Sequence, residues 1–234
     1  MLSTVLLRLL DEARRDELAF IDGLDARARE AMGAPDCWSA RDHVAHVAYW
    51  RLRLADRLHA IHRNEPQPEL EAWESQNAKV FEEYRDRSWP DVLAEVDRSH
   101  RALSACIERL SDEDLITFGR FDWLDGQPLH DAVMGSAYEH LQVHLSQYHV
   151  ERGDLPEARR IHERSVARVV DAGVPPALAG VVLYNLACSY ALHGDLEEAR
   201  TTLDRALALY PTPHLADWAR TDPDLAALRD DGAA

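Results

Sequence analysis

The stretch of sequence from residue 138 to residue 159 reads YEHLQVHLSQYHVERGDLPEAR. It begins with His140 and His144, which are four residues apart and would share one face of a helix. It then reaches Gly153-Asp154, a turn signal that is followed directly by another segment of helix-forming residues. The pattern predicts a helix that carries two neighbouring histidines, continues to about Arg152 and turns back into a second helix.

The segment after that turn recurs later in the chain. GDLPEAR at residues 153–159 returns as GDLEEAR at residues 194–200, and an internal repeat is a strong fold signal. The second copy resembles a tetratricopeptide (TPR) repeat, with small and large apolar residues at the packing positions of its two helices. The first copy is degenerate, and its helices would be the end of the histidine helix and residues 156–171. We therefore expect TPR-like hairpins over residues 153–211, with short capping helices within 213–228.

The sequence before the repeat also has helical periodicity and lacks strand-like alternation. Helices are expected over about 2–32, from Ser39 as an N-cap to Arg63, over 70–110 with a break near Pro90, and over 129–152. Long helices with short connections predict a four-helix bundle. The predicted fold class is all-α: a bundle in residues 1–152, and a TPR-like tail packed on it in residues 153–234.

A third histidine completes a candidate metal site. His46 lies on the predicted second helix, in WSARDHVAHVAYW at residues 38–50, and could close a triad with His140 and His144. Three imidazoles with an open position are typical of catalytic zinc sites, and nitrogen ligands favour zinc or nickel over calcium or magnesium. The alternative is coincidence, because the chain has 12 histidines. We interpret His43 as a flanking or surface histidine.

The charge and composition of the chain argue against nucleic acid and membranes as binding partners. The formal net charge of −16 leaves no basic surface for nucleic acid or an anionic membrane, and no apolar stretch is long enough for a membrane span. The apolar N-terminus is interrupted by charges, which favours an amphipathic helix over a signal peptide. Three widely separated cysteines, Cys37, Cys106 and Cys188, form no disulfide framework. We expect reduced thiols and a cytoplasmic protein.

Residues 2–150 resemble the DinB-like four-helix-bundle superfamily, and within it the ClbS/DfsB branch. The resemblance is carried by WSARD at residues 38–42 with His46 and Trp50, and by SHRAL at 99–103 and LSDEDL at 110–115. FDW at 121–123 and YEH at 138–140 with His144 complete it.

The resemblance implies a divalent metal, zinc or nickel, held by His46, His140 and His144. It also implies a low-molecular-weight thiol as co-substrate, because known members include thiol-dependent transferases and isomerases. The ClbS branch is associated with resistance to a reactive, electrophilic bacterial toxin. Around such a site we expect apolar walls from Trp50, Trp123 and Tyr138. Asp42 and Glu139 are candidate acceptors for the imidazole protons.

Two hypotheses follow. The first is a metal-dependent transferase or hydrolase that acts on a small electrophilic substrate in a detoxification or resistance role. The second is a non-catalytic module that binds a small molecule in the bundle pocket, or a protein partner or second copy of the chain (a homodimer) through its TPR-like tail.

Overall fold

The computed structural model describes residues 1–35, 37–69 and 73–231. Within these ranges the regular secondary structure is helical, and the only β-type pairing is an isolated bridge between Ala34 and Cys37. The chain divides into two compact units, Met1–Ile161 and His162–Ala234, and the boundary falls inside helix α9 (Leu155–Asp171). The all-α fold class predicted from the sequence is confirmed.

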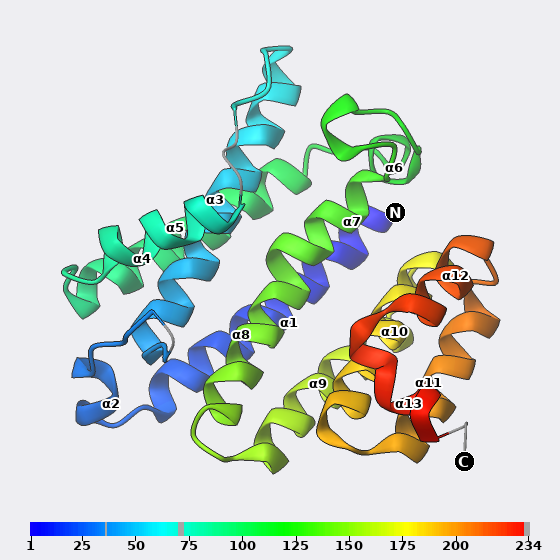
Figure 1. Ribbon diagram of the computed structural model, residues 1–234. Coiled ribbons are helices and arrows are strands. Elements are labelled where there is room, and N and C mark those ends of the chain that lie inside the picture. The colour runs from blue at the N-terminus through cyan, green and yellow to red at the C-terminus, as the bar shows by residue number, and fades with distance from the viewer. Residues whose placement is uncertain (36, 70–72, 232–234) are drawn as a thin grey trace. The chain divides into compact units, whose positions relative to one another are not determined.

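The first unit is a bundle of four long helical segments. These are α1 (Leu2–Gly23), α3 (Ala40–Arg63), α5 (Trp89–Ile107) and a composite fourth segment. Both α1 and α3 contact α5 and α8, which closes the bundle around a shared core (Figure 1). Shorter elements lie in the connections: α2 (Ala26–Glu30), α4 (Trp73–Tyr84), α6 (Asp112–Ile116) and the 3-10 turn η1 (Asp122–Leu124).

Side-chain caps explain where the long helices begin. The Ser39 hydroxyl accepts from the backbone N–H of Asp42, and the Asp42 carboxylate accepts from the backbone N–H of Ser39 at 2.8 Å. This capping box fixes the start of α3. At the start of α5 the Ser88 hydroxyl accepts from the backbone N–H of Asp91, and Pro90 lies in the first turn, so the predicted break near Pro90 is a new helix start.

The first helix is shorter than expected. It ends at Gly23, not near residue 32, and α2 follows with Asp25 as its N-cap, whose carboxylate accepts from the N–H of Ala28 at 2.7 Å. A glycine with low helix propensity followed by a strong N-cap residue ends one helix and starts the next. The predicted 70–110 segment becomes α4 and α5, and residues 70–72 lie outside the described ranges.

The fourth segment contains a feature that the sequence did not reveal. It consists of α7 (Leu129–Val133), a π-helical turn η2 (Met134–Tyr138) and α8 (Glu139–Val150). In the π turn the N–H of Glu139 donates to the carbonyl of Met134, five residues back. Such turns occur mostly as short bulges inside α-helices, frequently at functional sites.

A buried ion pair crosses the bundle between α1 and α3. The Arg51 guanidinium donates to both carboxylate oxygens of Glu17 at 2.9 Å, and the two residues are 2% and 0% exposed. Arg14 also donates to Glu17 at 2.8 Å, and to Asp97 on α5 at 2.8 Å. This network satisfies charges that would otherwise be costly to bury.

A tight turn connects α8 to α9 within the first unit. Gly153 adopts a positive φ of 75° in the turn, and the N–H of Asp154 donates to the carbonyl of His149 at 2.9 Å. The hydroxyl of Ser146 on α8 then donates to the carbonyl of Ala158 on α9 at 3.2 Å. This hydrogen bond joins the first turns of α9 to α8 within the first unit.

The second unit contains the clearer TPR-like hairpin. α10 (Pro176–His193) packs closely on α11 (Leu196–Leu209), and Gly194 at φ 85° makes the turn between them. A Cβ atom added to Gly180 would lie 2.6 Å from the Cβ of Tyr210, so the two helices need a glycine there. α12 (Pro213–Thr221), η3 (Pro223–Leu225) and α13 (Ala226–Asp231) follow.

No helix in the described part of the chain has both the length and the apolar character needed to cross a membrane.

Candidate metal centre

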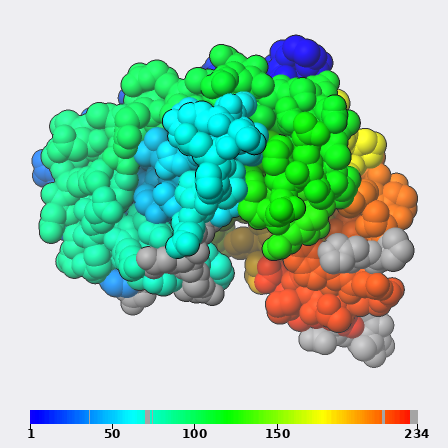
Figure 2. Space-filling model, turned by 90° about the horizontal axis from the view of Figure 1, so that it is seen from above, coloured from blue at the N-terminus to red at the C-terminus, as the bar shows by residue number. Residues whose placement is uncertain are grey.

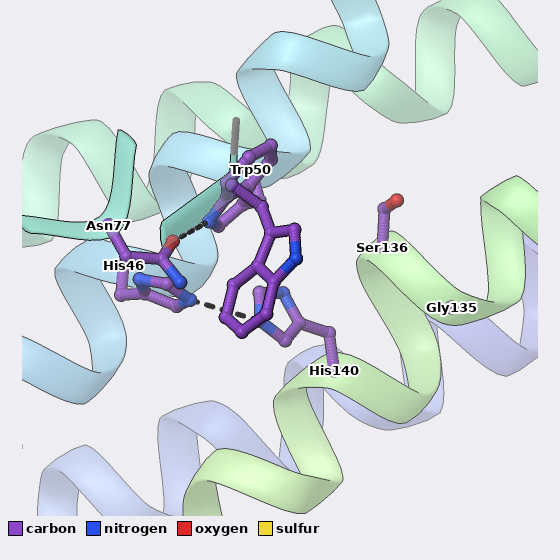
Figure 3. A pocket seen from close by; sticks show the side chains of 7 residues that line it. His46, Trp50, Asn77, Gly135, Ser136 and His140 are labelled. Atoms are coloured by element: carbon purple, nitrogen blue, oxygen red, sulfur yellow. Dashed lines mark hydrogen bonds between the residues drawn. The ribbon is translucent and has the colours of Figure 1, made fainter. Parts of the chain in front are cut away.

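The three predicted histidines come together inside the bundle. His46 lies two turns into α3, where the Ser39 capping box sets its direction, and His140 and His144 lie one turn apart on α8. His46 is 4% exposed and His144 9%, so the cluster is enclosed. Figure 3 shows His46 and His140 facing one another from the two helices.

Their ε nitrogens converge on one point. His140 Nε2 lies 3.1 Å from His46 Nε2 and 3.0 Å from His144 Nε2. One ring nitrogen carries either a single proton or a single lone pair, so His140 Nε2 cannot make two good hydrogen bonds. One candidate ligand atom from each residue lies within 4.8 Å of the others, so the group could hold a metal ion.

The spacing fits a small divalent ion. Three nitrogens at 2.0–2.1 Å from a tetrahedral zinc ion would lie about 3.3 Å from one another. The observed separations of 3.0 and 3.1 Å are slightly shorter, and small side-chain rotations would bring the rings to ligand distance. Imidazole nitrogens are also a type of ligand atom that zinc and nickel prefer.

Burial keeps all three rings neutral, the form in which imidazole binds metals. It lowers the pKa of His46 to about 3, with the neighbouring histidines adding to the effect. Burial and then the nearby Arg51 lower the pKa of His140 to about 4, while the backbone of Ser136 opposes them. Burial is also the largest cause of the pKa of His144 lying well below its usual value.

His43 was expected to flank the site or lie at the surface, and it flanks the site from a buried position. It is 1% exposed, and its Nδ1 lies 3.1 Å from the Nδ1 of His144. It shares the inner face of α3 with His46, because residues three apart on a helix are neighbours. The sequence signal was the H-x-x-H spacing, which suits either a ligand pair or a ligand with a supporting residue.

Trp38 covers the cluster from the start of α3. Its ring stacks on His144 with an interplanar angle of 4° and a centroid distance of 5.6 Å. It also contacts the rings of His46 and His43 at centroid distances of 5.0 and 5.4 Å. The indole therefore shields the histidines from solvent.

Asp42, one of the two expected acceptors for the imidazole protons, has a different role. The Asp42 carboxylate accepts from Ser39, so its role is to cap α3. Nδ1 of His46 is buried without a hydrogen-bond partner among the described residues.

A cavity of about 180 Å³ opens beside His46 and His140. It lies between α3, α4 and the π turn, and its lining consists of His46, Trp50, Trp73, Asn77, Gly135, Ser136 and His140 (Figure 3). The Trp50 indole donates to the Asn77 side-chain oxygen at 3.1 Å. In the space-filling view the cyan C-terminal half of α3 reaches the surface between the teal and green segments of this unit (Figure 2).

The walls of this cavity differ from the prediction. Trp50 lines it as expected, but Tyr138 is 1% exposed in the core, and Trp123 packs under the guanidinium of Arg57 at 4.4 Å. Trp73, Asn77 and Ser136 replace them, and no pattern in the sequence marked these residues.

A second group of potential ligands, Cys188, Asp222 and Asp224, lies in the second unit. Asp222 already accepts from the Tyr184 hydroxyl at 2.7 Å and from the backbone N–H of Asp224 at 2.9 Å. Burial, with Asp222 beside it, raises the pKa of Cys188 to about 12, so the thiol stays protonated. These contacts are those of a packed helix cap.

Comparison with known families agrees with this geometry. A TPR family matches residues 138–212, and no curated protein or solved structure gives a significant match. The DinB superfamily matches residues 9–148, a range that contains the three histidines and covers more than half of the 234 residues. The chain therefore belongs to the DinB superfamily, with a TPR-like extension that begins on its last bundle helix.

Proposed function

We propose that this chain is a metal-dependent DinB-like enzyme that acts on a small electrophilic molecule, by thiol transfer or hydrolysis. His46, His140 and His144 would hold the metal ion, zinc or nickel. The observation that carries the proposal is the convergence of their three Nε2 atoms, on neutral rings, next to an open cavity.

Each part of the site has a role in this proposal. A bound divalent ion supplies a nucleophile at neutral pH by lowering the pKa of a coordinated water or thiol. Trp38 excludes water from one side of the histidines, and the cavity on the His46–His140 side leaves room for the substrate. The Asn77 amide and the Ser136 hydroxyl are the polar groups that can orient a bound molecule there.

The described lining of the cavity contains no cysteine. Cys106 and Cys188 are buried, and burial raises the pKa of both thiols, so neither is poised as a nucleophile. Cys37 is exposed but is not among the residues that line the cavity, so a thiol used in the reaction would come from a separate low-molecular-weight molecule.

Metal content tests the ligand set. We expect the purified full chain to bind close to one zinc or nickel ion, and His140→Ala to lose most of that affinity. His193→Ala is the matched control, because His193 is an exposed histidine whose Nδ1 contacts the Ser189 carbonyl in the second unit. A chain that takes up no stoichiometric metal, or a His140→Ala variant that binds it as well as the parent, would refute the site.

Turnover tests the reaction class. Metal-loaded protein should consume a small model electrophile, such as an epoxide or an activated alkyl halide, faster than chelator-treated protein. Dependence on an added thiol indicates transfer, and thiol-independent loss indicates hydrolysis.

The TPR family match favours a second candidate function. TPR-like helices at residues 138–212 suit an interaction module, and in that case the bundle would bind a small molecule or a protein without chemistry. Metal-free protein that retains full activity in a partner- or ligand-binding assay would support this alternative over the enzyme.

A further inference from the structure

His43 contacts one of the candidate ligands directly. It lies on α3, one turn before His46, and its Nδ1 faces the Nδ1 of His144 across the bundle at 3.1 Å. We propose that His43, supported by Glu151, is a positioning residue that fixes the proton of His144 on Nδ1 and so leaves His144 Nε2 free to bind the metal. The metal part of this inference rests on the proposed function.

The short distance between the two Nδ1 atoms requires a proton on one of them. If His43 donated, a neutral His144 would keep its own proton on Nε2, where it would point at His140 Nε2 and the centre of the cluster. If His144 donates, its Nε2 carries a lone pair directed at that centre. Only the second arrangement is compatible with a metal ion.

The surroundings of His43 favour the second arrangement. When His43 accepts at Nδ1, its own proton lies on Nε2, which is 3.7 Å from the Glu151 carboxylate. This Nε2 has no hydrogen-bond partner among the described residues, and the Glu151 carboxylate is the anionic group that faces it. The other neighbours are the Trp38 and Tyr148 rings, and Arg152, which lies 3.8 Å from Glu151 and disfavours a charged His43.

The resulting chain runs from Glu151 through His43 to His144. A ligand imidazole that donates its other N–H to a fixed acceptor is held in one orientation and becomes a more basic ligand. Loss of such a partner typically costs about 10- to 100-fold in metal affinity. His46 has no comparable support among the described residues, because its buried Nδ1 lacks a partner.

The first measurement needs neither a variant nor a metal. Long-range ¹H–¹⁵N NMR spectra of the metal-free full chain report which ring nitrogen of each histidine carries the proton. We expect His144 to be the Nδ1–H tautomer and His43 the Nε2–H tautomer. Finding the proton of His144 on Nε2 would overturn the inference, whether or not the protein binds metal.

Two variants separate positioning from packing. His43→Phe keeps a ring but removes both nitrogens, and should weaken zinc binding by about 10- to 100-fold in a chelator competition. His43→Asn places an amide oxygen near the former Nδ1 and should recover most of the affinity and the His144 tautomer. His130→Phe removes another buried histidine (4% exposed) outside the cluster and should bind zinc like the parent.

The outcomes are distinguishable. Equal zinc affinity of His43→Phe and the parent would overturn the positioning role, and so would equal losses in the Phe and Asn variants. If no form binds zinc, the proposed function fails, and the NMR spectra still decide the tautomer of His144.

Discussion

Four histidines, the buried His43, His46 and His144 and the half-buried His140, concentrate groups that ordinarily titrate near pH 6.5 inside one bundle. Each ring is neutral in the folded chain because burial disfavours its charged form. In the unfolded chain the same rings take up protons near their usual pKa. The cluster therefore couples folding to pH.

This coupling predicts loss of stability in mild acid. The folded pKa values, about 3 for His43 and His46 and about 4 for His140, lie below the unfolded value. The stability is thus present above about pH 6.5 and falls as the pH drops toward the folded pKa values. We expect up to about 1.4 kcal/mol per pH unit from each histidine, measured by urea unfolding of metal-free protein between about pH 7 and pH 5. His43→Asn, with one fewer titrating ring, should show a shallower decline; identical free energies of unfolding across this range would contradict the explanation.

At the scale of helices, α1 and α3 are linked by the Glu17–Arg51 pair. Both charges are buried, and Arg51 also contributes to the low pKa of His140, so this pair lies close to the histidine cluster. A buried pair of this kind adds little net stability over apolar packing but is costly to break.

We predict that Glu17→Gln destabilises the chain by about 3–5 kcal/mol, because it leaves the Arg51 guanidinium buried without its counter-charge. Replacing both residues with Met should recover most of the loss. Chemical unfolding measures both variants. Glu82→Gln removes a partner from the exposed Arg85–Glu82 pair and should change stability by less than about 1 kcal/mol. A Glu17→Gln variant as stable as this control would show that the pair is not the link between the helices.

The helices themselves could be predicted where their ends carry side-chain signals. Ser39 and Ser88 mark the starts of α3 and α5, and the repeated Gly-Asp pairs mark the turns before α9 and α11. The π turn at Met134–Tyr138 could not be predicted, because no residue of MGSAY is a signal for hydrogen bonds that reach five residues back. The lining of the cavity could not be predicted from the sequence either. Asn77 and Ser136 belong to segments whose approach to α3 depends on tertiary packing.

For the histidines, the sequence identified the candidate cluster but not its supporting residue. Helical spacing sets His140 and His144 on one face, and His46 on the predicted second helix was the candidate that closes the triad, a choice that the family resemblance also implied. His43 could not be assigned from the same spacing, because its neighbour His144 lies about a hundred residues away in the chain.

At the scale of the molecule, the first compact unit extends past the end of α8 into α9. The start of α9 buries Ala158 and Ile161, which are 2% and 3% exposed, within the first unit. Sequence reasoning places the domain boundary at residue 152, with the tail packed on the bundle. Our proposal is that the first turns of α9 belong to the bundle's core.

Truncation tests this proposal. A chain that ends at residue 152 should expose the apolar surface covered by α9, and should lose about 25 cal/mol for each Å² uncovered. A chain that ends at residue 171 retains all of α9 and is the matched control. Thermal melts and zinc binding should show the shorter chain to be weaker in both. If the shorter chain matches the full chain in melting temperature and metal affinity, the tail is an independent module.

The DinB and TPR matches overlap at residues 138–148, which include His140 and His144. The two matches therefore offer no boundary at which recombination could exchange one of them and leave the other whole. A crossover within this overlap would give α8 a new sequence, and with it new neighbours for the histidines. Over evolutionary time the two parts should be inherited and lost together, and a hybrid made from two relatives should keep its site only when α8 and the bundle come from the same parent.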